Sequence, residues 1–227
     1  ATIDVEVNGA IVVSAGVGLP EPDGAVIVLP SALTARKIIR ARQTSAGATS
    51  DWSNSVTVRS YREDFPAGLP RPVINPAPVY KCGIRTGVSN LLLGSNAWIT
   101  DNGATVGSIN GAKQHQGINI MPAYDINRKV LAQAELCGDK SPLSALEITV
   151  NAAYPLPTPT FDPIYDGATQ IRINNIANGA KVKLEINGAS QGTIGCWGGS
   201  LYWNVTAPLP ATTPLKATQS LCADQPS

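Results

Sequence analysis

The sequence lacks both a strong excess of charge and a long apolar run. Only 15% of its 227 residues are charged, and 17 Lys and Arg against 16 Asp and Glu give a net charge of +1. A chain this close to neutral has no strong field with which to hold a nucleic-acid backbone. Its apolar runs, such as residues 91–93, are far shorter than the ~20 residues that cross a bilayer. We therefore expect no nucleic-acid partner and no membrane insertion.

Residues suited to catalysis are scarce. The single histidine, His115, lies in the polar, glycine-flanked stretch 110–117, which predicts a loop, and no acid that would orient it can be identified. Asp101 and Asp166 stand beside turn sequences, where aspartate serves the backbone. The sequence contains no phosphate loop, dinucleotide fingerprint or zinc-protease motif. We expect a non-enzymatic protein without a cofactor or a metal.

Glycine, proline and apolar residues are plentiful. The 21 Gly and 18 Pro follow no Gly-X-Y period, which indicates many turns between short elements. An apolar fraction of 43% is typical of a folded globular protein and excludes wholesale disorder. Long helices are therefore not expected, and short strands are.

Self-similarity along the chain indicates its architecture. Residues 94–107 align without gaps on residues 179–192, and residues 1–10 fit the same template. A second template occurs three times, at 38–50, 129–141 and 214–226. The resulting repeat of about 85 to 90 residues is a common size for a small β-sandwich domain.

Alternation within these templates predicts strands and tight hairpins. Residues 181–186 alternate charged with apolar side chains, and residues 2–7 alternate polar with apolar ones, as half-buried strands require. Each strand ends in an Asn-Gly pair that suits positive φ in a two-residue turn. These pairs are Asn8-Gly9, Asn102-Gly103 and Asn187-Gly188.

We predict an all-β chain of tandem antiparallel β-sandwich modules, with boundaries at 1–62, 63–152 and 153–227. In this division the first module lacks its first strands and the third lacks its last strand. Two explanations stay open. The chain is an excerpt of a longer array, or it is a self-assembling subunit whose incomplete ends complete one another between chains.

Residues 38–58 carry a family resemblance. They resemble the last two strands of fibronectin type III and related immunoglobulin-like modules, in which an inward-facing strand enters a Gly-Ser turn and returns as an alternating strand; residues 130–150 repeat the pattern. The resemblance implies that the modules are immunoglobulin-like β-sandwiches, and that they act as spacers, adhesive domains or carbohydrate-binding accessories of a microbial surface protein.

The four cysteines fall in the second and third modules. Cys137 and Cys222 occupy the same repeat position, so we predict one bridge inside each module, Cys82–Cys137 and Cys196–Cys222. No C-x-x-C pair or histidine cluster accompanies them, which argues against a metal site. An even number of cysteines indicates an oxidising compartment, and hence a secreted or cell-surface protein.

Aromatic residues are only 5% of the chain, so a cluster of them is a candidate ligand site. Trp197, Tyr202 and Trp203 lie together among glycines and could stack on sugar rings. The structural interpretation is that Trp203 faces a core, Tyr202 faces outward and Trp197 covers a Cys196 bridge. Trp98 stands at an outward strand position and is a candidate for a contact with another module or a partner.

Two functions are consistent with these features. The first is a non-enzymatic structural or adhesive array, which could polymerise into a fibre; its partners would be neighbouring modules of the same or identical chains, surface glycans or host proteins. The alternative is a carbohydrate-binding accessory module that uses the Trp197, Tyr202 and Trp203 cluster.

Overall fold

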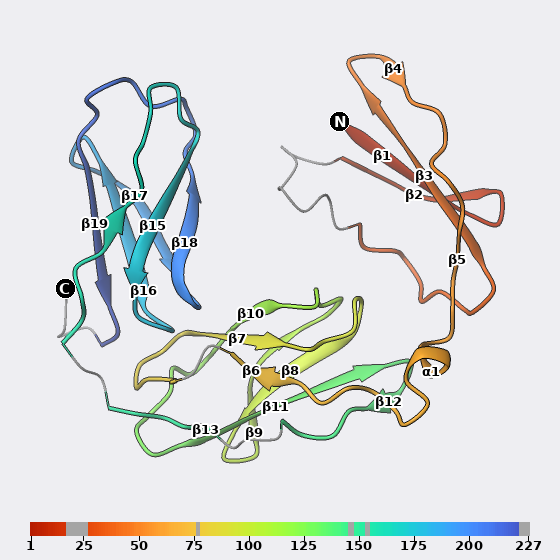
Figure 1. Cartoon of the computed structure of the whole chain (residues 1–227), viewed down its shortest axis with the longest axis horizontal. Coiled ribbons are helices and arrows are strands. Elements are labelled where there is room, and N and C mark those ends of the chain that lie inside the picture. The colour runs from red at the N-terminus through yellow and green to blue at the C-terminus, as the bar shows by residue number, and fades with distance from the viewer. Residues whose placement is uncertain (17–26, 76–77, 145–147, 153–154, 223–227) are drawn as a thin grey trace. The chain divides into compact units, whose positions relative to one another are not determined.

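A computed structural model describes residues 1–16, 27–75, 78–144, 148–152 and 155–222 (Figure 1). The chain divides into two compact units, Ala1–Gly68 (unit 1) and Leu69–Ser227 (unit 2). The named strands all pair antiparallel, and the helix in these ranges, α1 (Tyr61–Asp64), is a single turn. No described helix has the length and apolarity needed to cross a bilayer. The predicted all-β class is confirmed.

Unit 1 contains one described sheet, with the order β2-β1-β3-β4; β5 pairs with the other end of β3. Its strands are β1 (Thr2–Val7), β2 (Ala10–Gly16), β3 (Ile38–Ser45), β4 (Ala48–Thr49) and β5 (Val56–Thr57).

Unit 2 begins with a complete sandwich, which we call the middle sandwich. Sheet β10-β7-β6 lies on one side of its core, and sheet β12-β11-β8-β9, with β13 also paired to β11, lies on the other. Its strands are β6 (Val73–Ile74), β7 (Arg85–Ser89), β8 (Asn96–Asp101), β9 (Ala104–Ile109), β10 (Gln116–Asn119), β11 (Lys129–Leu136), β12 (Asp139–Lys140) and β13 (Ile148–Thr149). The chain crosses between the sheets after β7, β9 and β10, as in an immunoglobulin-like sandwich.

The C-terminal sandwich of unit 2 repeats this plan. Sheet β14-β15-β18 faces sheet β17-β16-β19, and no described strand takes the place that β12 and β13 have in the middle sandwich. Its strands are β14 (Thr160–Phe161), β15 (Gln170–Ile176), β16 (Lys181–Ile186), β17 (Ala189–Gly195), β18 (Gly199–Asn204) and β19 (Leu215–Ser220).

The predicted Asn-Gly hairpins are confirmed. They join β1 to β2, β8 to β9 and β16 to β17. Asn8, Asn102 and Asn187 have φ of 49°, 47° and 51°, and the glycines that follow have φ of 88°, 84° and 76°. Two successive positive φ values match the twist of the paired strands.

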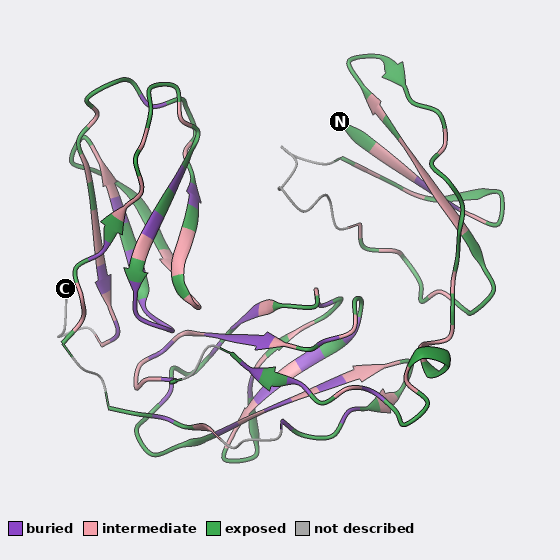
Figure 2. Ribbon diagram, in the orientation of Figure 1, coloured by how far each residue is buried: buried purple, intermediate pink, exposed green. Residues whose placement is uncertain are grey.

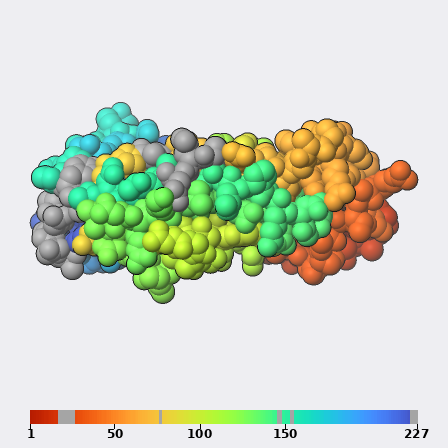
Figure 3. All heavy atoms as spheres, turned by 90° about the horizontal axis from the view of Figure 1, so that it is seen from below, coloured from red at the N-terminus to blue at the C-terminus, as the bar shows by residue number. Residues whose placement is uncertain are grey.

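Each sandwich of unit 2 encloses its own core. Ile99 and Val130 in the middle sandwich, and Ile173 and Leu184 in the C-terminal sandwich, are fully buried. In Figure 2 buried residues recur along these strands, as side chains that alternate between two faces require. Figure 3 shows, in yellow-green and green, one face of the middle sandwich. Unit 1 differs, because Val5 and Glu6 are its only buried residues among those described.

The predicted boundaries at 1–62, 63–152 and 153–227 stay a prediction. The two compact units divide after Gly68, and unit 2 holds two cores connected by a disulfide and hydrogen bonds.

Candidate functional site

The junction between the two sandwiches of unit 2 brings together a disulfide, a tryptophan and an arginine. It is covalent: Cys82, which precedes β7, is bonded to Cys222, which follows β19, across a sequence separation of 140. The predicted bridges Cys82–Cys137 and Cys196–Cys222 are therefore wrong. That prediction assumed that each module closes its own bridge, whereas the end of β19 lies against the neighbouring sandwich. Cys137 is an exposed thiol and Cys196 a buried one.

Hydrogen bonds and a close glycine contact support the disulfide. The Ile84 N–H donates to the Gly179 carbonyl at 3.0 Å, and the Asn178 side-chain amide donates to the Pro78 carbonyl at 2.9 Å. A Cβ on Gly179 would lie 2.9 Å from the Gly83 Cα, so the two backbones touch there. Gly179 also has φ of 82°, which favours glycine.

Trp197 lies against the middle sandwich. A Cβ on Gly87 in β7 or on Gly117 in β10 would collide with its indole ring. These two strands are paired with Gly87 opposite Gly117, so the two glycines together form a flat seat for the ring. Trp197 therefore packs across the junction, and the predicted role of covering a Cys196 bridge is wrong.

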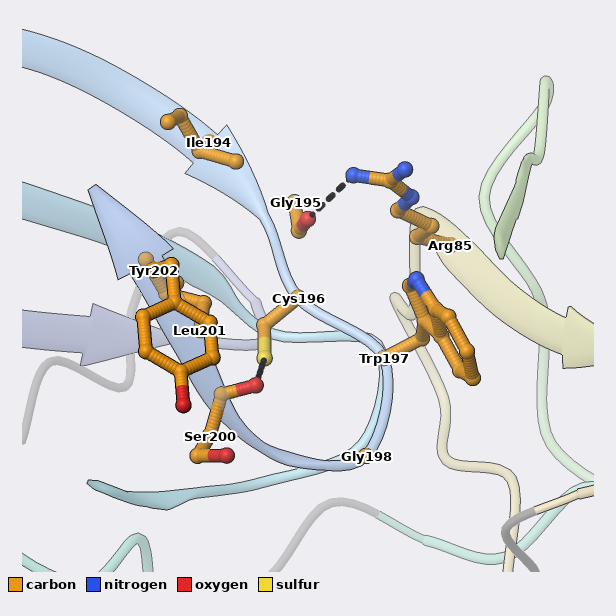
Figure 4. A pocket seen from close by; sticks show the side chains of 9 residues that line it. All are labelled: Arg85, Ile194, Gly195, Cys196, Trp197, Gly198, Ser200, Leu201 and Tyr202. Atoms are coloured by element: carbon orange, nitrogen blue, oxygen red, sulfur yellow. Dashed lines mark hydrogen bonds between the residues drawn. The ribbon is translucent and has the colours of Figure 1, made fainter. Parts of the chain in front are cut away.

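Arg85 lies beside Trp197 and connects the same two sandwiches (Figure 4). Its Nη1 donates to the Gly195 carbonyl at 3.0 Å, while its buried Nε has no hydrogen-bond partner. Burial lowers the pKa of the Arg85 guanidinium from its ordinary value, and the nearby Cys196 sulfur opposes that change.

Cys196 is held as a neutral thiol. Its side chain is 2% exposed, and its Sγ donates to the Ser200 carbonyl at 3.5 Å. Burial raises the pKa of the Cys196 thiol to about 11, and the Arg85 guanidinium offsets only part of that rise. Because the thiolate is the reactive form of cysteine, this residue is a packing group at neutral pH.

The structure separates the three aromatic residues that the sequence placed together. Trp203 is 5% exposed and packs in the C-terminal core, as the structural interpretation predicted. Tyr202 is 61% exposed, and the Arg172 guanidinium lies 5.6 Å from its ring centre. Of these three aromatic residues, Trp197 and Tyr202 line a shallow groove of about 410 Å³, which Arg85 and Cys196 also line. No flat platform of three rings exists.

The remaining candidates lie elsewhere. Trp98 is half-buried in β8, with the Lys140 ammonium 5.7 Å from its ring centre, and its predicted contact with another module or partner stays a prediction. His115 is exposed, between β9 and β10. Within the described ranges, no three His, Cys, Asp or Glu side chains gather as a metal site.

Sequence reasoning missed the glycine seat and Arg85. Nothing local in residues 85–89 shows that the glycine of this strand faces a tryptophan about a hundred residues away. The only available signal was the pair of glycines, Gly87 and Gly117, inside two strands, because glycine in a strand often marks a close approach.

No protein-family model and no curated protein matches the chain. Among solved structures, a biofilm-associated protein BSP domain has 18% identity and a TM-score of 0.36, covering 84% of this chain and 40% of that one. The central fibronectin-III array of a RIM-binding protein has 13% identity and a TM-score of 0.25, covering 100% of this chain and 86% of that one. The FN1–FN3 domains of chicken CNTN1 have 11% identity and a TM-score of 0.23, covering 96% of this chain and 84% of that one.

These likenesses are weak. This chain spans only 40% of the biofilm-associated chain, and all three TM-scores lie below 0.5. The immunoglobulin-like architecture of unit 2 is instead evident from its own paired sheets and two cores.

Proposed function

We propose that this chain is a non-enzymatic structural or adhesive array of an extracellular or cell-surface protein, in which unit 2 is a stiffened pair of sandwiches. The observation that carries the proposal is the Cys82–Cys222 disulfide between two separately cored sandwiches. A flexible tandem pair needs no such bond, because each sandwich buries its own apolar face. The bond, the Trp197 seat and the Ile84–Gly179 hydrogen bond all restrict motion between the sandwiches.

Disulfide chemistry supports the location. Structural disulfides persist in oxidising compartments and are rare where thiols are kept reduced. The partners proposed for the array are neighbouring modules of the same or identical chains, surface glycans or host proteins.

The chemistry of the junction supports a structural role over a catalytic one. Its thiol, Cys196, is kept protonated by burial, and the Arg85 guanidinium is engaged with a carbonyl across the junction. Cys196 therefore serves as a packing group of the C-terminal sandwich, and Arg85 serves the contact between the sandwiches.

The proposal is tested by pulling on the full chain from its two ends in a force spectrometer. A disulfide that spans 140 residues removes them from the length over which the chain can be stretched. Fully extended, these residues would span about 480 Å at ~3.4 Å per residue. We expect the oxidised chain to extend by about that much less than the reduced chain. A Cys82→Ser, Cys222→Ser double variant should match the reduced chain, and Cys137→Ser should match the oxidised one. Equal extension in oxidised and reduced chains would overturn the proposal.

Fibre formation is the finer part of this proposal. Assembly of identical chains predicts that sedimentation velocity of the oxidised protein shows species that grow with concentration. A single monomeric species across the accessible concentration range would restrict the array to the modules of one chain.

Carbohydrate binding is the second candidate. The observation in its favour is the exposed Tyr202 ring at the groove that Trp197 also lines. A glycan array, followed by titration with tryptophan fluorescence, tests it. Saturable quenching that is lost in Tyr202→Ala would support this function, and no response to any glycan would reject it.

A further inference from the structure

Cys137 is the one exposed free thiol among the described residues. It lies in the turn between β11 and β12, with φ of 53°, and is followed by Gly138 with φ of 85°. The chain has four cysteines in all. Cys82 and Cys222 are bonded to each other, and Cys196 is 2% exposed. No accessible cysteine of the same chain is left to pair with Cys137.

Cys137 and Cys222 hold the same place in the repeat. Each follows a leucine, which is the last residue of β11 in one case and the residue just after β19 in the other. Both strands pair with the strand before an Asn-Gly hairpin. Cys222 uses this place to bond a neighbouring sandwich, at Cys82 in the segment between that sandwich's first two strands. The bonded state of Cys222 is thus an independent indication of what a cysteine at this position binds.

The turn between β7 and β8 matches a turn that contributes to the junction. In the C-terminal sandwich the turn between β15 and β16 contacts the middle sandwich through Asn178 and Gly179. The matching turn of the middle sandwich, between β7 and β8, has Leu93 and Gly94 at these positions. Gly94 has φ of 84°, close to the 82° of Gly179, and Leu93 is 69% exposed. An apolar side chain and a thiol are therefore exposed at positions that, in the other sandwich, form an interface.

We propose that Cys137 is a covalent attachment site for a cysteine of a further immunoglobulin-like sandwich, carried between that sandwich's first two strands as Cys82 is. Residues 1–81 contain no cysteine, so the partner sandwich lies outside these 227 residues. This inference rests on the proposed function, since it extends the array by the bond that already joins two of its members.

The bond forms by thiol–disulfide exchange. The Cys137 thiol loses its proton to solvent, and its thiolate attacks the partner cysteine while that sulfur is held in a mixed disulfide with a small thiol. The new S–S bond forms as the old one breaks, and the small thiol leaves as a thiolate with the electron pair. The oxidant is the small-molecule disulfide of an oxidising compartment.

The test uses the full chain with its native disulfide and a peptide that copies residues 78–84. This segment contains Cys82 and the two backbone groups, the Pro78 carbonyl and the Ile84 N–H, that bond the neighbouring sandwich. Its cysteine is activated as a mixed disulfide with thionitrobenzoate, whose release is followed by absorbance. We expect one peptide per chain, located on Cys137 by mass mapping, and coupling several-fold faster than with a scrambled peptide.

Matched variants identify the thiol. Cys137→Ser and Cys137→Asn should take no peptide, and Asn tolerates the positive φ of this turn, so misfolding does not confuse the result. Cys196→Ser should react as the parent chain does. Equal rates with the matched and scrambled peptides, or coupling at Cys196, would overturn the proposal. Neither outcome affects the force measurement, because Cys137→Ser leaves the Cys82–Cys222 bond in place.

Discussion

Unit 1 and unit 2 are built from the same hairpins but are stabilised on different faces of their sheets. In unit 1 the polar face of the sheet carries paired charges: Arg40 makes a bidentate ion pair with Glu6 at 2.7 and 2.9 Å, and Arg42 pairs with Asp4 at 3.0 Å. Both guanidinium groups lie within 4.7 Å of the Trp52 ring centre. In unit 2 the inward faces of the sheets meet in two apolar cores. One strand pattern therefore supports two kinds of stabilisation, charge pairing and apolar burial.

Removal of the disulfide should produce the largest difference in stability between unit 1 and unit 2. The double variant Cys82→Ser, Cys222→Ser is expected to lower the free energy of unfolding of unit 2 by up to ~5 kcal/mol. The reason is that a cross-link lowers the entropy of the unfolded chain, and a longer closed loop gives a larger effect. Urea titration followed by hydrogen exchange and mass spectrometry reports each unit separately. Unit 1 should not change, and Cys137→Ser is the control. An equal loss in unit 1 would contradict this prediction.

A core truncation should come next. Leu184 is fully buried in β16, and Leu184→Ala should cost unit 2 ~2–5 kcal/mol through lost burial and a residual cavity. Val5 holds the matching position in β1, and Val5→Ala should cost unit 1 less, because the described residues give it one sheet and few buried neighbours. The same hydrogen-exchange measurement compares them. A larger loss from Val5→Ala would show that unit 1 has a tight core of its own.

The glycine seat predicts an intermediate effect. Gly117→Ala should cost unit 2 ~1–3 kcal/mol, since its methyl group would meet the Trp197 ring and the Arg85 Nε. In a double-mutant cycle with Trp197→Ala the two losses should be strongly non-additive. Gly16→Ala in unit 1 is the matched control, because no atom lies within 4 Å of its added Cβ. Additive losses would indicate that Trp197 does not sit on Gly117.

Alkaline pH should weaken unit 2. Burial raises the pKa of Cys196 to about 11 from an ordinary value of 9.0, so its contribution is complete below pH ~9 and is lost as the pH rises through ~11. Cys196→Ala should remove this component of the pH dependence. Burial also raises the pKa of Tyr124, so a second alkaline component should remain in that variant. Thermal unfolding from pH 7 to pH 11 measures both, and an unchanged profile in Cys196→Ala would contradict the assignment.

Acid and salt should lower the stability of unit 1, and this effect should be the smallest of those predicted. Hydrogen bonds from Ser14 and Arg42 lower the pKa of Asp4, and a hydrogen bond from Arg40 lowers that of Glu6. A lowered folded-state pKa gives stability that is present above the ordinary value near 4 and is lost as the pH falls through the folded value. Thermal unfolding from pH 6 to pH 2, repeated in 0.5 M salt, should show a loss that Asp4→Asn reduces. An acid loss that persists unchanged in Asp4→Asn would assign it to other carboxylates.

The sequence predicted the local structure well because the signals for it are local. The Asn-Gly pairs at Asn8, Asn102 and Asn187 fix turns within two residues, and the alternation before each pair fixes which side chains face inward. Alternation of Trp203 with Leu201 and Val205 likewise predicted that Trp203 faces a core, where it is 5% exposed. None of these conclusions requires knowledge of where another sandwich lies.

The candidate site was less predictable because its contacts are between sandwiches. Cys137 and Cys222 share a repeat position, yet only Cys222 meets a cysteine, and that cysteine is 140 positions away. Trp197 appeared to belong with Tyr202 and Trp203 because they are close in sequence, although neighbouring strand residues point to opposite faces. Its actual contacts, Gly87 and Gly117, belong to the other sandwich.

The amino-acid order alone determined that this chain forms repeated antiparallel hairpins with one apolar face, since strand alternation and turn chemistry act over a few residues. Only the tertiary structure decided which cysteines bond, which tryptophan crosses between sandwiches and which thiol stays exposed. These outcomes depend on how two finished sandwiches meet, and a pairing between distant surfaces leaves no period in the sequence.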